Sequence, residues 1–294
     1  MKKIVVFGGN GFLGSHMVDY LVNLEKYDVY SFGLGPHPLL SKEKNIIGDI
    51  LDTELLEAVT VGTYAVFDYI AVADIEECIK NPTRAVQVNI CGTAGLLSAC
   101  AKNKVKRFLF ASSVYAESSL GGIYRTTKAA CESLIKDYNK YYDLDYTILR
   151  YGTVYGPRSD KNNSVYRFVA DALQKKKIRY HGTGDERREY IHVYDAARLS
   201  HSALKEEYKN QVLTLTGHKS LKVKSLLAII KEILDDRVEI VFKSEHNKNL
   251  LKSHYRMTPY SYSAETPFKL VGTQYVDIGA GILQCIKEQE GCKK

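Results

Sequence analysis

The 294-residue sequence lacks the features of disulfide-rich secreted proteins, zinc proteins and membrane proteins. Its six cysteines include no C-x-x-C pair and no grouping with histidine of the kind that binds zinc. No hydrophobic run approaches the length of a transmembrane helix, and the four apolar residues before Gly8 are too few for the core of a signal peptide. We therefore expect reduced thiols, no metal, no membrane contact and a cytoplasmic protein.

The sequence also lacks a basic surface suited to nucleic acid, although its net charge is +7. Basic residues cluster at 102–107 and 175–179, and neither cluster is interleaved with aromatic side chains that could stack on bases. The first cluster precedes a predicted strand, and the second ends a predicted helix, where cations favour the helix dipole. These clusters indicate solvated faces with some attraction for anionic substrates, and we expect no nucleic-acid partner.

What the sequence does contain is a glycine-rich turn close to its start. Gly8, Gly11 and Gly14 follow an apolar run at residues 4–7 and lead into a helical pattern that begins at Phe12. Glycine permits positive φ and a close approach of a pyrophosphate, while a helix N-terminus offers unpaired N–H groups. Such turns also close βα units that bind nothing, but a turn directly after the first strand favours a dinucleotide site.

Apolar runs alternate with helical patterns through the first 155 residues. Strands are expected at residues 4–7, 28–32, 45–47, 64–73, 107–111 and 146–151. Helices are expected after residues 12 and 53 and over residues 82–102 and 124–142. This alternation predicts an α/β fold with a Rossmann-like doubly wound parallel sheet.

From Gly156 onward the alternation loosens into shorter elements. They are predicted at residues 164–175, 178–180, 188–193, 196–204 (with Asp195 as N-cap), 211–215, 221–234 and 277–288. We interpret this half as a smaller C-terminal α/β substrate-binding domain. The predicted division gives residues 1–155 plus about 186–210 to the NAD(P)-binding domain, and residues 156–185 and 211–294 to the cap.

Tyr124 and Lys128 stand four residues apart on a predicted helix and therefore share one face. A free phenol has a pKa near ~10, and we expect a nearby ammonium and an oxidised nicotinamide to lower the pKa of Tyr124. The phenolate could then take the proton of a substrate hydroxyl as hydride leaves its carbon. Ser112 and Ser113, which end the fifth strand, are candidates to hydrogen-bond the same oxygen. Because this spacing arises often by chance in a chain with 22 tyrosines, the interpretation depends on the glycine turn and the serine pair.

The end of the second predicted strand leaves the choice between NAD and NADP open. An acidic residue at this point often holds the adenine ribose, and an arginine beside it can hold a 2′-phosphate. Here Gly33 stands where the acid is expected, and no arginine lies beside it.

Taken together, these motifs resemble those of the extended short-chain dehydrogenases/reductases, in the nucleotide-sugar epimerase/dehydratase group. The resemblance covers residues 1 to about 235 and is loose beyond them. The stretches that carry it are 8–14, 48–50, Asn89 with 92–93, 110–113, 124–128, 149–158 and 188–193.

The resemblance implies a role for each matching residue. Tyr124 would be the catalytic base, Lys128 its partner and Ser113 the catalytic serine. Cofactor contacts would come from Tyr124 and Lys128 and also from Gly8, Gly11, Phe12, Leu13, Gly14, Gly33, Asp49, Ile50, Ile70, Ala71, Val72, Asn89 and Tyr151. Substrate contacts would come from Ser113, Thr153, Arg188 and, as a second phosphate ligand, Arg256. The alternative for Arg188 is a surface ion pair with Glu186 or Glu189.

The implied activity is NAD(P)-dependent oxidoreduction at C4 of a nucleotide-activated sugar, with a 4-epimerase acting through a 4-keto intermediate as the leading expectation. A 4-dehydrogenase or a 4-ketoreductase would use the same base and cofactor. Dehydratases of the group carry a Thr-Asp-Glu triplet where this chain has Ser113, Val114 and Tyr115, so we do not expect a 4,6-dehydratase.

The chain departs from the family pattern at two positions, and two other functions are alternatives to the epimerase. Thr153 stands where many epimerases have asparagine, and Gly33 replaces the ribose-binding acid. A non-catalytic NAD(P) sensor or RNA-binding relative would need the glycine turn but not the Tyr–Lys pair, and a dehydrogenase for steroids or similar alcohols would not need Arg188. The resemblance also implies a homodimer that pairs the helices at 82–102 and 124–142.

Overall fold

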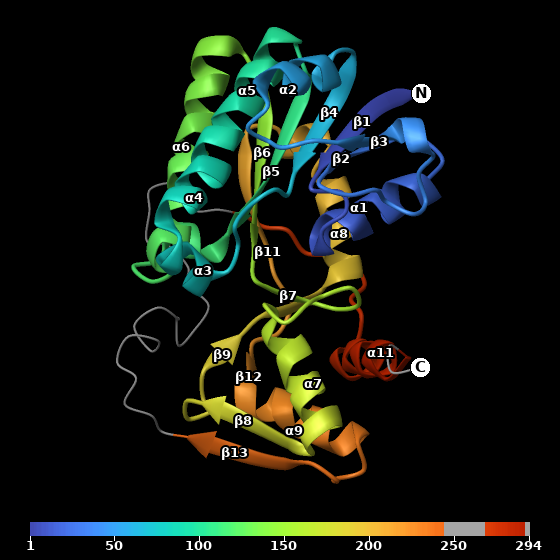
Figure 1. Cartoon of the computed structure of the whole chain (residues 1–294), viewed down its shortest axis with the longest axis vertical. Coiled ribbons are helices and arrows are strands. Elements are labelled where there is room, and N and C mark those ends of the chain that lie inside the picture. The colour runs from blue at the N-terminus through green and yellow to red at the C-terminus, as the bar shows by residue number, and fades with distance from the viewer. Residues whose placement is uncertain (244–267, 292–294) are drawn as a thin grey trace. The chain divides into compact units, whose positions relative to one another are not determined.

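The computed structural model describes residues 1–243 and 268–291 (Figure 1). These residues form two compact units. The first comprises Met1–Tyr151, Ala197–Leu215 and residues 268–270, and the second comprises Gly152–Ala196 with residues 216–243 and 271–291. Four segments therefore lie elsewhere than in the predicted division, because residues 152–155 and 186–196 join the second unit and residues 211–215 and 268–270 join the first.

A parallel sheet of eight strands forms the centre of the first unit, in the order β14-β11-β6-β5-β4-β1-β2-β3. Its strands are β1 (Lys2–Phe7), β2 (Tyr27–Gly33), β3 (Asn45–Ile47), β4 (Thr63–Asp68), β5 (Arg107–Ser113), β6 (Tyr146–Tyr151), β11 (Gln211–Leu215) and β14 (Phe268–Lys269). The strand order reverses between β1 and β4, and ligands of such sheets bind at this switch point. The doubly wound α/β fold is thus confirmed.

Helices cover both faces of this sheet, and this explains why its strands read as continuous apolar runs. Helices α2 (Thr53–Thr60), α5 (Thr93–Lys102) and α6 (Gly122–Tyr142) lie on one face, and α1 (Phe12–Asn23) lies on the other (Figure 1). The C-terminal part of α8 (Val193–Ser202) packs on the same side as α1, where His201 hydrogen-bonds the hydroxyl of Tyr27 at 3.0 Å. All four apolar residues of β1 from Ile4 to Phe7 are fully buried.

The helical segment predicted at residues 82–102 consists of three pieces. They are α4 (Pro82–Val86), the π-helical turn η2 (Gln87–Gly92) and α5. A further short helix, α3 (Ile75–Lys80), precedes them and is capped by the Asp74 carboxylate, which accepts a hydrogen bond from the Glu77 N–H at 2.8 Å. π-helical turns occur often at functional sites, and η2 carries Asn89.

Two predicted boundaries are wrong. Strand β4 ends at Asp68 and not at Ala73, since the chain leaves the sheet there to line a pocket. Asp195 is not an N-cap, because α8 begins at Val193; its carboxylate instead accepts a hydrogen bond from the Val276 N–H at 2.8 Å. The terminal helix α11 (Ile278–Gly291) begins one residue later than predicted because Asp277 caps it.

The second unit is smaller and also mixes helices with short strands. It contains α7 (Ser164–Lys175), α9 (Val223–Ile233) and α11, which surround a core that includes Val169, Leu226, Ile230 and Ile282. Its strand pairs are β7 (Thr153–Tyr155) with β10 (Tyr190–His192), β8 (Lys177–His181) with β13 (Glu239–Lys243), and β9 (Arg187–Arg188) with β12 (Leu221–Lys222). The predicted smaller C-terminal α/β unit is confirmed as a fold.

Residues 1–243 and 268–291 contain neither a membrane-spanning helix nor a cluster of metal ligands. No helix there is long and apolar enough to cross a membrane. No group of three or more His, Cys, Asp or Glu side chains in these residues could hold a metal ion. Their cysteines are free thiols, at positions 78, 91, 100, 131 and 285.

Candidate cofactor and catalytic site

The glycine turn between β1 and α1 is shaped so tightly that side chains cannot replace its glycines. Gly8 has φ +79°, and its carbonyl oxygen lies only 2.2 Å from the position that a Cβ on Gly14 would occupy. The Gly11 N–H donates to that same carbonyl at 2.9 Å and closes the turn. The sequence predicted glycine here for its positive φ, and the structure adds close packing of the turn against the first residues of α1.

The start of α1 is open to an anion. Gly11 is its N-cap in an extended conformation, no side chain caps the helix, and its first turn holds no acidic residue. The N–H groups of the first helical turn have no acceptor inside the helix, and the helix dipole is positive at this end. This arrangement suits the pyrophosphate of a dinucleotide.

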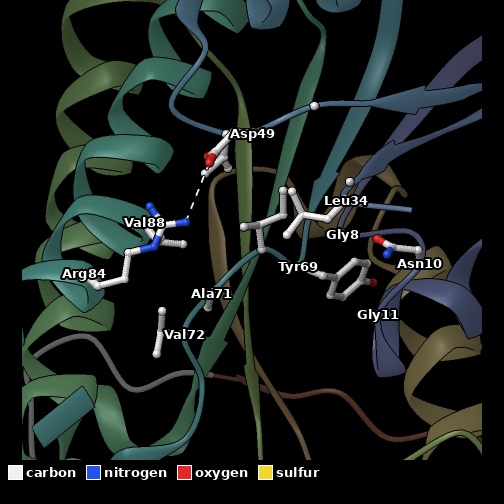
Figure 2. Close-up of a pocket in the computed structure, with 14 residues that line it drawn as sticks. Gly8, Asn10, Gly11, Leu34, Asp49, Tyr69, Ala71, Val72, Arg84 and Val88 are labelled. Carbon is white, nitrogen blue, oxygen red and sulfur yellow. Dashed lines mark ion pairs between the residues drawn. The ribbon is translucent and has the colours of Figure 1, made fainter. Parts of the chain in front are cut away.

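A pocket of about 320 Å³ lies beside this turn, at the switch point of the sheet (Figure 2). Eight of the residues predicted to bind cofactor line it: Gly8, Gly11, Gly33, Asp49, Ile50, Ile70, Ala71 and Val72. Six lining residues were not predicted: Asn10, Leu34, Gly48, Tyr69, Arg84 and Val88. The pocket therefore joins the glycine turn, the end of β2, the Asp49 loop and the segment after β4.

The remaining predicted cofactor residues lie around the pocket and not in its lining. Phe12, Leu13 and Gly14 form the first turn of α1. Asn89 holds the segment after β4, because its side-chain amide accepts from the Val72 N–H at 2.7 Å and donates to the Val72 carbonyl at 3.1 Å. Tyr151 is buried at the end of β6, and its hydroxyl shares a hydrogen bond of 2.6 Å with Ser200.

Tyr124, Ser113 and Lys128 are brought together where β5 ends and α6 begins. Tyr124 is half-buried and hydrogen-bonded to the Ser113 hydroxyl. Lys128 lies one turn further along α6, is 3% exposed, and donates to the Ala111 carbonyl at 2.7 Å. The entry into α6 needs glycine at Gly121, where φ is +99° and a Cβ would lie 2.7 Å from the Tyr115 ring.

The pKa of Tyr124 differs from the sequence-based expectation. Desolvation of the phenol raises the pKa of Tyr124 to about 12, and the hydrogen bond from Ser113 lowers it only in part. Burial also lowers the pKa of Lys128, whose ammonium is turned to the Ala111 carbonyl. Without the nicotinamide charge that is part of that expectation, loss of solvation dominates, and the pKa of Tyr124 lies above its ordinary value and not below it.

A buried carboxylate accompanies the catalytic lysine. Asp68 ends β4, is 1% exposed, and accepts hydrogen bonds from the Ile70 N–H at 3.1 Å and the Thr93 hydroxyl at 3.4 Å. Desolvation raises the pKa of Asp68 to about 6, against the opposing attraction of Lys128. Asp68 and Lys128 are thus two buried groups, each of which favours the charged form of the other.

Apart from Ser113, which lies in the first unit, the predicted substrate residues lie in the second unit or outside the described residues. Thr153 opens β7, and its N–H donates to the Glu189 carbonyl at 3.3 Å. Arg188 is half-buried on β9, and its charge reaches Tyr180 strongly enough to oppose the rise in the pKa of that phenol. Arg256 lies outside the described residues.

Comparison with known proteins agrees with this geometry. Residues 4–214 match the family model described as the NAD dependent epimerase/dehydratase family. The chain belongs to that family. The match spans the glycine turn, the Tyr–Lys pair and Arg188, and it confirms the resemblance that these motifs carry.

Three proteins illustrate what the chain is similar to. A putative UDP-glucose 4-epimerase of Methanocaldococcus jannaschii is 29% identical over 261 residues, which cover 81% of this chain and 85% of that protein. The dTDP-D-glucose 4,6-dehydratase of Homo sapiens is 27% identical, with 79% of this chain and 75% of that protein covered. The crystal structure of UDP-glucose 4-epimerase from Thermotoga maritima, with UDP-glucose, superposes with a TM-score of 0.83 at 25% identity, covering 99% of this chain and 100% of that one.

Family membership makes NAD the cofactor of the chain, and the residues around the pocket suit a dinucleotide. The tight turn beside the pocket needs glycine at Gly8, where φ is +79°, and at Gly14, where a Cβ would lie 2.2 Å from the Gly8 carbonyl oxygen. The uncapped start of α1 would bind the phosphates, and Asp49 and Ile50 lie where the adenine would be bracketed. Tyr124 and Lys128 lie within the matched residues and in the same unit as the pocket.

Some of the lining residues that the sequence analysis missed could have been predicted from the sequence, and others could not. Tyr69 directly precedes the predicted Ile70, and Gly48 precedes the predicted Asp49, so extending each motif by one residue would have included both. Arg84 and Val88 reach the pocket from α4 and η2, whose bend no pattern in the sequence indicated. Asn10 was overlooked between two glycines.

Proposed function

We propose that the chain is an NAD-dependent 4-epimerase of a nucleotide-activated sugar. The observation that carries the proposal is the meeting of Tyr124, Ser113 and Lys128 in the unit that also holds the dinucleotide pocket. The similarity to proteins named as UDP-glucose 4-epimerases supports a UDP-sugar as the first substrate to test.

The proposed chemistry assigns one task to each side chain. Bound NAD supplies the acceptor of a hydride from C4 and later its donor. The Tyr124 oxygen takes the proton of the C4 hydroxyl, and Ser113 hydrogen-bonds the same substrate oxygen. Because the pKa of Tyr124 is about 12 in the protein alone, the phenolate must gain stabilisation from positive charge near the nicotinamide and from Lys128. Return of proton and hydride to a 4-keto sugar that has turned over gives the other epimer.

A net 4-dehydrogenase or 4-ketoreductase remains the neighbouring alternative, since the same groups serve it. A 4,6-dehydratase would in addition need acids to eliminate water. Ser113 is followed by the buried Val114 and by Tyr115, and the acid of the 3₁₀ turn η3 (Val114–Glu117), Glu117, pairs with Arg150 at 2.6 Å. These contacts support oxidoreduction without dehydration.

For substrate binding we propose Ser113, Thr153, Arg188 and Arg256. The guanidinium of Arg188 could hold a diphosphate by two parallel hydrogen bonds, which a lysine could not.

The deciding experiment incubates the purified chain with UDP-, GDP-, dTDP- and CDP-sugars and identifies the products. A 4-epimer without net change in reduced cofactor supports the proposal, reduced cofactor indicates a dehydrogenase, and a 4-keto-6-deoxy sugar indicates a dehydratase. Tyr124→Phe should abolish turnover and still bind NAD. Tyr115→Phe is the matched control, because this neighbouring ring lies 6.5 Å from that of Tyr124 but has Ser119 and not a lysine four residues later. Full activity of Tyr124→Phe would refute the assignment.

We also propose a homodimer through α5 and α6. Tyr141 and Tyr142 at the end of α6 are 66% and 62% exposed, and the Ser98 and Tyr138 hydroxyls of α5 and α6 bond each other at 2.6 Å. Two large exposed aromatic side chains on one helix suit an interface. Sedimentation of the wild type against a Tyr141→Glu, Tyr142→Glu variant tests this; a wild-type monomer would contradict it.

A further inference from the structure

The end of β2 lacks the acid that often binds the adenine ribose, and the structure shows what occupies its place. Gly33 is buried, and a Cβ built there would lie 2.2 Å from Oδ1 of Asn10. A Cβ on Gly35 would lie 3.2 Å from Nδ2 of the same side chain. The Asn10 amide therefore lies across the strand end, in the volume that a side chain at position 33 would need.

Asn10 and Gly33 both line the dinucleotide pocket, and Asn10 is exposed, so that its amide is open to a ligand. The turn that presents it is fixed to the strand, since the N–H groups of Gly8 and Gly9 both donate to the Phe32 carbonyl, at 2.7 and 3.3 Å. An amide offers one acceptor and two donors. It can thus accept from a ribose hydroxyl as a carboxylate does, and it can also donate to a phosphate oxygen, which a carboxylate cannot.

The charges that line the pocket do not oppose a 2′-phosphate. The lining contains one acid, Asp49, and one base, Arg84, and these pair with each other at 3.7 Å (Figure 2). They lie at the opposite end of the pocket from Asn10 (Figure 2). The ribose end of the lining is consequently neutral, whereas a carboxylate there would repel a second phosphate.

We propose that Asn10 is the residue that hydrogen-bonds the adenine ribose, and that the pocket binds NADP about as well as NAD. Asn10 and Gly33 act as a pair of complementary size, in which a small residue at the strand end makes room for the amide. The inference rests on the family's dinucleotide cofactor and not on the proposed sugar substrate.

The test titrates NADH and NADPH into the full chain, freed of retained nucleotide, and follows the fluorescence of the reduced nicotinamide. The two dissociation constants should agree within about tenfold, since no carboxylate discriminates between them. Asn10→Ala should weaken NADH binding by about fivefold through loss of neutral hydrogen bonds. A larger preference of the wild type for either dinucleotide, or unchanged NADH binding by Asn10→Ala, would overturn the proposal.

A double variant tests the size relationship. Asn10→Ala combined with Gly33→Asp places a carboxylate where the amide was, and it should prefer NADH over NADPH by about a hundredfold or more. Gly33→Asp alone should bind NADH less tightly than the double variant, because its Cβ would lie 2.2 Å from Oδ1 of Asn10 and the exposed amide must turn away. A double variant with the wild-type ratio of NADH to NADPH affinity would count against the assignment.

These measurements are binding constants and do not depend on the proposed function. A chain that binds both dinucleotides but converts no sugar would refute the proposed function and leave this inference intact.

Discussion

The side chain of Asn89 satisfies both backbone polar groups of Val72. Its Oδ1 accepts from the Val72 N–H at 2.7 Å, and its Nδ2 donates to the Val72 carbonyl at 3.1 Å and to the Thr127 hydroxyl at 2.9 Å. Asn89 is 1% exposed and lies on the π-helical turn η2. One amide therefore joins the cofactor-lining segment after β4 to the helix that carries Tyr124.

Asn89→Ala should weaken NAD binding by about tenfold and lower the free energy of unfolding by about 1–3 kcal/mol, because it leaves polar groups near Val72 without partners. Calorimetric titration with NAD and urea denaturation measure the two effects. Asn81→Ala is the matched control, since its exposed amide donates only to Glu77 among the contacts of the described chain. Equal NAD affinities of the two variants would show that Asn89 does not shape the pocket.

Gly14→Ala should abolish most NAD binding. The new Cβ would lie 2.2 Å from the Gly8 carbonyl oxygen, so the glycine turn must move away from the start of α1. Overpacking of this kind costs about 1–3 kcal/mol, and its effect falls on the pyrophosphate cradle. Thermal melts with and without NAD separate the loss of stability from the loss of binding.

The control for this change is a helical glycine that has room for a methyl group. A Cβ on Gly95 in α5 would meet Leu56 and Thr53 at 3.5 Å, an ordinary contact distance. Gly95→Ala should therefore gain up to about 1 kcal/mol of helix propensity and bind NAD as the wild type does. If Gly14→Ala also retained wild-type affinity, the packing argument would be wrong.

The sequence predicted those parts of the fold and site that depend on local patterns. The glycine turn and the Tyr124–Lys128 spacing each depend on a few neighbouring residues, and the alternation of strands and helices depends on short apolar runs. The structure contains all three. Strand β11 was placed in the cap because its local sequence looks the same whether it extends the main sheet or starts another.

The missed features depend on residues that are distant in the sequence. The pKa of Tyr124 follows from how completely the surrounding elements remove water from the phenol, and spacing along α6 does not report that. Arg84 on α4 and Asp49 after β3 are distant in the sequence, and they pair at 3.7 Å only in the folded chain. The position of the Asn10 amide across Gly33 becomes visible only in the folded chain.

Asp68 should give the stability of the protein a distinctive pH dependence. The folded pKa of Asp68, about 6, exceeds the ordinary value of 3.8 for aspartate, so between these pH values the folded chain binds more protons at Asp68 than the unfolded chain does. Stability from this group is then present below about pH 4 and lost as pH rises through about 6, by up to about 3 kcal/mol. The difference in unfolding free energy between wild type and Asp68→Asn should fall accordingly in urea titrations across this range.

Asp185→Asn is a control at a carboxyl group whose pKa is shifted in the opposite direction. Hydrogen bonds from Lys224 and Lys222 lower the pKa of the exposed Asp185 to about 2, so its contribution is lost only as pH falls below about 4. Between about pH 5 and 7 the wild type and Asp185→Asn should differ by a constant amount. A flat difference for Asp68→Asn as well would mean that Asp68 is not buried as a charge.

Arg150→Met should destabilise the chain far more than the loss of an exposed ion pair. The Arg150 guanidinium donates to both carboxylate oxygens of Glu132, at 3.0 and 2.6 Å, and pairs with Glu117 at 2.6 Å. The side chains of Arg150 and Glu132 are each 7% exposed. Removing the cation leaves the Glu132 charge buried without a counterion, at a cost of about 3–5 kcal/mol in urea denaturation.

Two further variants separate burial from pairing. Lys102→Met breaks an equally short pair, 2.6 Å from Glu57, but both side chains are largely exposed and the cost should be about 0–1 kcal/mol. Adding Glu132→Leu to Arg150→Met removes the stranded charge and should restore most of the lost stability, because a buried pair replaced by apolar groups is often neutral. If Arg150→Met cost no more than Lys102→Met, water would have to reach the Glu132 carboxylate. The end of β5, which carries Ser113, would then be less tightly enclosed than these contacts indicate.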